Sequence, residues 1–109
     1  KPTYSCFAYE RKMPKLNSSN PEERAYFMEV CRYWIREFKV DGWRLDVAAD
    51  LGHSPEYNHR FWKDFRRAVK KANPEAVILA EHYGDPWEWL KGDQWDTGEL
   101  GDLAERRHV

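Results

Sequence analysis

The sequence predicts an α/β fold in which a helix joins two parallel strands. Two short apolar runs, at residues 43–48 and 76–80, are strand-like, and one amphipathic helical segment lies between them. A strand, a helix and a strand form a right-handed crossover, which brings both strand ends to the same edge of a sheet. The chain has 109 residues, enough for one small domain of this kind.

Residues 1–19 lack a sustained period and predict a loop, and a helix is expected to follow and to stop near Lys39. Asn20 is a good N-cap, Pro21 suits the first helical position, and Glu23 completes a capping-box-like spacing. Apolar residues then recur every three or four positions and predict one buried helix face. This stripe comprises Phe27, Val30, Cys31, Trp34, Ile35 and Phe38.

The period changes to two after the turn signal Asp41-Gly42. Such alternation predicts a strand with one apolar and one polar face, in an exposed sheet or equally in a barrel wall. The apolar positions are Trp43, Leu45 and Val47, and they alternate with Arg44, Asp46 and Ala48.

The remaining elements follow from similar patterns. A second helix is predicted from about Tyr57 to Ala72, where Asn73-Pro74 ends it. The run Ala76–Ala80 is continuously apolar, which is typical of a parallel strand covered on both faces. Asp85-Pro86 predicts a short helix through Leu90, and residues 97–109 are expected to form an irregular polar tail with a helical turn or two.

Asp46 and Glu81 end the two predicted strands, so the crossover places two carboxylates at one sheet edge, as glycosidic bond cleavage needs. Arg44 lies two residues before Asp46 and points the same way, and a guanidinium there would keep a nucleophilic carboxylate ionised and oriented. Glu81 follows an apolar run, and apolar surroundings raise the pKa of a carboxyl, as a general acid requires. Each residue also has a structural alternative: an ion pair that anchors a strand end for Asp46, and a helix N-cap or solvent-facing strand end for Glu81.

Aromatic residues make up 16% of the chain, with six Trp, and such side chains fill cores but also stack on sugar rings. Trp34 and Trp43 are expected in the core. His82 is expected to point away from Glu81, either as a wall of the same cleft or as a buried hydrogen-bonding residue. The aromatic residues placed near a sugar are Tyr83, Trp87 and Trp89.

Composition excludes several classes of partner. A net charge of −1 and a pI near 6.5 argue against nucleic acid, and no run approaches the ~18 apolar residues of a membrane span. The N-terminal segment lacks a signal-peptide core, which leaves the compartment open with the cytoplasm slightly favoured. Cys6 and Cys31 form no metal-like pair, so neither a metal site nor a cofactor is expected, and Cys31 is expected to be a buried free thiol.

Three segments resemble the alpha-amylase family of glycoside hydrolases: Met13-Pro14-Lys15-Leu16-Asn17, then Gly42 to Ala48, then Ile78 to Glu81. The first looks most like the neopullulanase, cyclomaltodextrinase and maltogenic amylase branch. The resemblance covers roughly residues 10–96 and implies a fragment of a (β/α)₈ TIM barrel, about strands 4 and 5 with flanking helices. Residues 1–109 would then be a partial catalytic domain, with residues 97–109 as an atypical tail.

The resemblance implies a role for each matching residue. Asp46 would be the nucleophile of a retaining mechanism, Arg44 its partner, and Glu81 the general acid and base. The substrate would be a maltodextrin, cyclodextrin or starch-like glucan, cut at α-1,4 or α-1,6 bonds. Ala49 and the pair His82-Tyr83 depart from the branch's usual residues, which leaves substrate preference open. The substrate-binding residues would be Asn17, His82, Tyr83 and Trp87.

Little or no activity is expected of the isolated chain, because further catalytic groups of the family lie outside these residues. One rival hypothesis is a non-catalytic carbohydrate-binding module. Another is a piece that self-associates as a homo-oligomer through exposed strand edges. Calcium in a longer parent is left open, since no calcium cluster is evident in this sequence.

Overall fold

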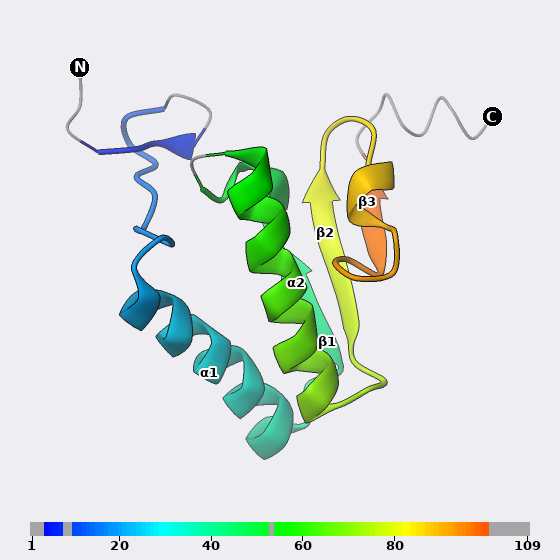
Figure 1. The fold of residues 1–109 in the computed structure, drawn as a ribbon. Helices are drawn as coiled ribbons and strands as arrows, with labels where there is room; N and C mark the ends of the chain where they lie inside the picture. Colours follow the sequence, from blue (N-terminus) through cyan, green and yellow to red (C-terminus); the bar gives the residue numbers. More distant parts are fainter. Residues whose placement is uncertain (1–3, 8–9, 53, 101–109) are drawn as a thin grey trace.

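The computed structural model describes residues 4–7, 10–52 and 54–100 (Figure 1). It has the predicted order of helices and strands as far as residue 96, and a third strand that was not predicted follows. Each strand is separated from the next by helical structure. The elements are α1 (Pro21–Phe38), β1 (Gly42–Leu45), the 3₁₀ turn η2 (Ala48–Asp50), α2 (Pro55–Ala72), β2 (Val77–His82), the 3₁₀ turn η3 (Trp87–Trp89) and β3 (Thr97–Leu100).

The three strands form one parallel sheet in the order β1-β2-β3. In the register, Arg44 of β1 lies opposite Leu79 of β2, and Glu81 of β2 lies opposite Glu99 of β3. All three strands therefore end at the same edge of the sheet. The predicted parallel crossover is confirmed for β1 and β2.

Helix α2 packs on one face of this sheet (Figure 1). Val69 of α2 and Ile78 and Ala80 of β2 are all fully buried in the shared core. The expectation that the strand at residues 76–80 is covered on both faces is wrong, because Val77 is exposed and Leu79 is only half-buried. Alternate residues of β2 thus face the helix, while the others face a more open side.

Helix α1 begins and ends where the sequence predicts. The side chain of Asn20 accepts hydrogen bonds from the backbone N–H groups of Glu22 and Glu23, and Lys39 ends the helix in the left-handed conformation. Its apolar stripe is only partly buried, however: Trp34 and Phe38, both predicted in the core, are exposed. Their rings instead contact each other and Tyr33 in tilted and edge-to-face arrangements on the outer surface. The face of α1 that packs inward does so through Met28 and Ile35.

The expectation of an irregular stretch from residue 97 onward is wrong for residues 97–100, which form β3. The backbone N–H of Asp96 donates to the carbonyl oxygen of Ile78 at 2.9 Å, which brings the chain alongside β2 just before β3 begins. The polar composition of residues 97–100 gave no strand signal, because this strand forms by pairing with β2 and not through an apolar alternation of its own. Residues 101–109, where a helical turn or two was expected, lie outside the described residues.

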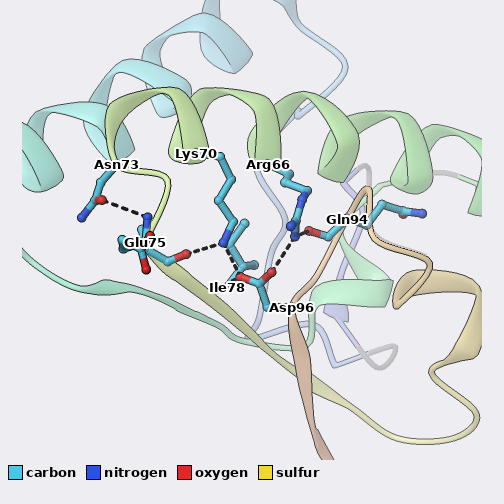
Figure 2. Close-up of polar contacts among 8 residues, drawn as sticks. Arg66, Lys70, Asn73, Glu75, Ile78, Gln94 and Asp96 are labelled. Carbon is cyan, nitrogen blue, oxygen red and sulfur yellow. Dashed lines mark hydrogen bonds and ion pairs between the residues drawn. The ribbon is translucent and has the colours of Figure 1, made fainter.

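The Asp96 carboxylate ties α2 to the start of β2 and β3 (Figure 2). It accepts hydrogen bonds from Lys70 Nζ at 2.8 Å, from Arg66 Nη1 at 2.7 Å and from the backbone N–H of Ile78 at 2.9 Å. Burial by itself would raise the pKa of Asp96, but the bonds from Lys70, Ile78 and Arg66 outweigh it and hold that pKa below its usual value. This cluster fixes the end of the sheet opposite to the one where the strands finish.

Candidate active site

Arg44 brings together the two carboxylates that the sequence analysis selected. Its Nη1 donates to Asp46 Oδ1 at 2.5 Å, and its Nη2 lies 3.1 Å from Glu81 Oε2. Arg44 and Glu81 come from neighbouring parallel strands, and Asp46 follows the end of β1. The predicted meeting of Asp46, Arg44 and Glu81 at the carboxyl edge of the sheet is therefore present.

The backbone turns sharply directly after Asp46. Strand β1 ends at Leu45 rather than continuing to Ala48 as predicted, because Val47 adopts a left-handed conformation (φ 45°) that leads into η2. Such a conformation costs a β-branched residue about 1–3 kcal/mol and is concentrated at functional sites. The turn aims the backbone N–H of Val47 at Glu81 Oε1, 3.1 Å away.

Glu81 is surrounded by hydrogen-bond donors instead of apolar groups. The Tyr83 hydroxyl donates to Oε2 at 2.9 Å, the Val47 N–H donates to Oε1, and Arg44 lies beside Oε2. Tyr83 first, then Val47 and Arg44, hold the pKa of Glu81 below its usual value of 4.5. The expectation of a raised pKa is thus wrong for this structure, because an apolar run in sequence did not produce an apolar environment at its end. The same bond raises the pKa of Tyr83.

A third carboxylate, Glu99 of β3, also contacts Arg44, with Glu99 Oε2 3.0 Å from Nε. The bonds to Glu99 and then to Asp46 raise the pKa of Arg44, so this side chain is a permanent cation. The sequence analysis missed Glu99 because it lies in β3, which was not predicted. The signal available in the sequence was weak: an acidic residue in a short segment after the Asp96 turn.

Of the other predicted site residues, all of which the structure describes, only Tyr83 forms a hydrogen bond with one of the carboxylates. Tyr83 contacts Glu81, and its ring is 69% exposed. Trp87 is 68% exposed on η3, where a sugar ring could reach it. Asn17 lies in the loop before α1, and its side chain accepts a hydrogen bond from the backbone of Ser19.

His82 does not join the carboxylates. It packs against Trp95 and Trp89, with ring centroids 5.5 Å and 6.2 Å away, and its Nε2 lies 3.2 Å from the Asp85 carbonyl oxygen. These contacts favour the predicted hydrogen-bonding role over a cleft wall, although the residue is only half-buried. Trp89, which we expected near a sugar, is buried and stacks on Trp95 at 4.6 Å. The aromatic segment after β2 therefore divides between surface residues and core residues.

Cys31 is a free thiol as expected, but it is half-buried rather than buried, and this burial raises its pKa to about 11. Among the described residues, no group of three or more His, Cys, Asp or Glu side chains is arranged to hold a metal ion. Within that same part of the chain, no helix is both long enough and apolar enough to cross a membrane.

A parallel β/α unit that presents paired carboxylates at the ends of neighbouring strands is typical of barrel-type glycoside hydrolases. The family model described as alpha amylase, catalytic domain, matches residues 2–99. The chain belongs to this family, as the motifs in its sequence predicted.

Individual relatives agree with the branch that the sequence resembles. The chain is 48% identical to a cyclomaltodextrinase of Geobacillus thermopakistaniensis, over 89% of this chain and 16% of that protein. It is 47% identical to a maltogenic alpha-amylase of Bacillus acidopullulyticus, again over 89% of this chain and 16% of the relative. A debranching enzyme from Nostoc punctiforme has a solved structure that matches 92% of this chain and 19% of its own, with 40% identity and a TM-score of 0.78. The chain thus spans about 16% of the length of the curated relatives it matches.

Proposed function

We propose that this chain is part of the catalytic barrel of an α-glucan hydrolase or transglycosylase. The observation that carries the proposal is the Arg44 guanidinium, which joins Asp46 and Glu81 across the ends of two parallel strands. The relatives are named as a cyclomaltodextrinase and a maltogenic alpha-amylase, which favours maltodextrins, cyclodextrins or starch-like glucans as substrates.

In the proposed retaining mechanism, the Asp46 carboxylate attacks the anomeric carbon while Glu81 gives its proton to the leaving glycosidic oxygen. This step forms a glycosyl ester on Asp46 and releases the shortened glucan. Water, or the hydroxyl of a second sugar, then attacks the ester carbon and gives its proton to Glu81, which frees Asp46. Arg44 donates a hydrogen bond to Asp46 Oδ1 and so orients this carboxylate for the first step. Tyr83 and Trp87 offer exposed rings on which a sugar would stack.

The isolated chain is expected to have little or no activity. Tyr83 first, then Val47 and Arg44, hold the pKa of Glu81 below its usual value, so these bonds disfavour the protonated carboxyl that a general acid must present. Asp46 is 79% exposed, so water competes with any sugar for its carboxylate. Both features oppose catalysis by this chain alone.

The test has two arms. The purified chain and its Asp46→Asn variant are incubated with cyclodextrin and with maltotriose, and no release of glucose or maltose above the variant is expected. In the second arm, residues 10–96 replace the matching segment of the Geobacillus cyclomaltodextrinase. We expect this chimera to hydrolyse cyclodextrin, and Asp46→Asn or Glu81→Gln to reduce its rate by at least about a hundredfold. Asp93→Asn in the chimera is the matched control for replacing an exposed carboxylate. An active chimera that keeps its rate with Asp46→Asn or with Glu81→Gln would refute the assigned roles.

A non-catalytic carbohydrate-binding module is the second candidate, favoured by the exposed rings of Tyr83 and Trp87. Maltotriose would then shift the NMR signals of both rings in the isolated chain, and Asp46→Asn would leave the affinity unchanged. Loss of binding in Asp46→Asn would argue against a purely aromatic platform.

Self-association is also proposed, because β1 and β3 each lie at an edge of the sheet and α1 exposes Trp34 and Phe38. Sedimentation of the chain at rising concentration is expected to show dimers or larger species. A monomer at high concentration would contradict this proposal.

A further inference from the structure

Three different nitrogens of Arg44 contact three different carboxylates. Nη1 and Nη2 face Asp46 and Glu81, while Nε, on the neighbouring edge of the guanidinium, faces Glu99 at 3.0 Å. The guanidinium is planar and its N–H groups have fixed directions, so a bond that holds one edge also sets where the other edge points.

The backbone of Glu99 is held more firmly than the backbone of Asp46. Its backbone lies in the β2–β3 ladder, where it is directly opposite Glu81, and its side chain is half exposed. Asp46 lies beyond the last residue of β1, and its side chain is 79% exposed. An acceptor fixed in a strand restrains Arg44 more firmly than one on a turn, because less of its freedom has to be lost when the bond forms.

We propose that Glu99 is a positioning residue, which binds Nε of Arg44 and so keeps the two Nη groups aimed at Asp46 and Glu81. The bond joins a carboxylate to a guanidinium, and such charge-assisted hydrogen bonds are stronger than neutral ones. The contact itself is independent of the proposed hydrolysis, although its value for catalysis rests on that function. Without Glu99, rotation about the Arg44 side chain would let the guanidinium leave one carboxylate for the other or for water.

The test is an NMR measurement on the ¹⁵N-labelled 109-residue chain, with no substrate present. The readouts are the exchange rate of the Arg44 Nε–H with water and the ¹⁵Nε relaxation that reports guanidinium motion. Glu99→Gln keeps an acceptor of the same length without charge, and Glu99→Leu removes the acceptor. Glu37→Gln on the exposed surface of α1 is the control for losing one negative charge. The amide of Gly98 reports separately on the β2–β3 ladder.

The expected order of Arg44 Nε–H exchange is slow in the parent and in Glu37→Gln, faster in Glu99→Gln, and roughly tenfold faster than the parent in Glu99→Leu. Gly98 should stay protected in Glu99→Gln, which separates a role in holding Arg44 from a role in docking β3. Equal Arg44 exchange in the parent and Glu99→Gln would overturn the proposal. So would an Arg44 change that appears only together with loss of Gly98 protection. Because no substrate is used, an inactive chain does not affect either outcome.

Discussion

Replacing Asp96 with Asn should be among the most damaging single polar changes to the stability of this fold. The carboxylate accepts from Lys70, Arg66 and the backbone N–H of Ile78, and its side chain is 25% exposed. Asn is nearly the same size and keeps one acceptor oxygen, so it can retain the backbone bond. The two charge-assisted bonds are weakened or lost, at about 1.5 kcal/mol each after allowance for partial exposure. The expected loss in the free energy of unfolding is therefore about 3 kcal/mol.

Urea unfolding followed by tryptophan fluorescence measures this loss directly, and the accompanying fall in Tm should be roughly 13 °C for a chain of this length. Asp93→Asn is the matched control, because Asp93 is an exposed partner of Lys63 at 3.6 Å, and its loss should cost less than about 0.5 kcal/mol. The pKa of Asp96 is lowered on folding, so its contribution is present above the unfolded value near 3.8 and is lost as the pH falls through the folded value. The two proteins should thus converge in stability in acid. A loss in Asp96→Asn no larger than in Asp93→Asn would refute the reasoning.

Three further changes have outcomes set by single contacts. In Gly42→Ala, the added Cβ would clash with the Val77 carbonyl oxygen, so urea unfolding should show a loss above about 2 kcal/mol in the free energy of unfolding. A loss under half that size would contradict the β1–β2 register. In Tyr83→Phe, the pKa of Glu81 should rise toward 4.5, since the Tyr83 bond lowers it most; an unchanged ¹³C titration midpoint would contradict this. Cys31, with a pKa of about 11, should react with iodoacetamide at pH 8 far more slowly in the folded chain than in urea, and equal rates would show that the thiol is not protected.

Local signals predicted much of this fold. The cap at Asn20 and the stop at Lys39 are set within a few residues, and the structure has both. The carboxylate pair was also predictable, because the crossover rule places Asp46 and Glu81 at one edge whatever the details of packing. The left-handed Val47 was not predictable, since a β-branched residue gives no sign of a turn.

Most of the errors have a physical origin in contacts between distant parts of the chain. Strand β3, and with it Glu99, depends on pairing with β2 and on the bonds of Asp96, neither of which leaves a period in the sequence. The pKa of Glu81 depends first on the Tyr83 hydroxyl two residues further along the chain, and then on Val47 and Arg44 from the neighbouring strand and its turn. Trp34 has the spacing of a core residue, but it is exposed and contacts Tyr33 and Phe38 on the surface of α1.

The Asp96 cluster and the Arg44 cluster occupy opposite ends of the same three strands. Rigidity at one end does not depend on the residues at the other, so substitutions in the loops beyond Asp46 and Glu81 can accumulate without unfolding the sheet. The two ends of the sheet can therefore change separately: residues near Asp46 and Glu81 can vary while the Asp96 cluster continues to hold α2 against the sheet.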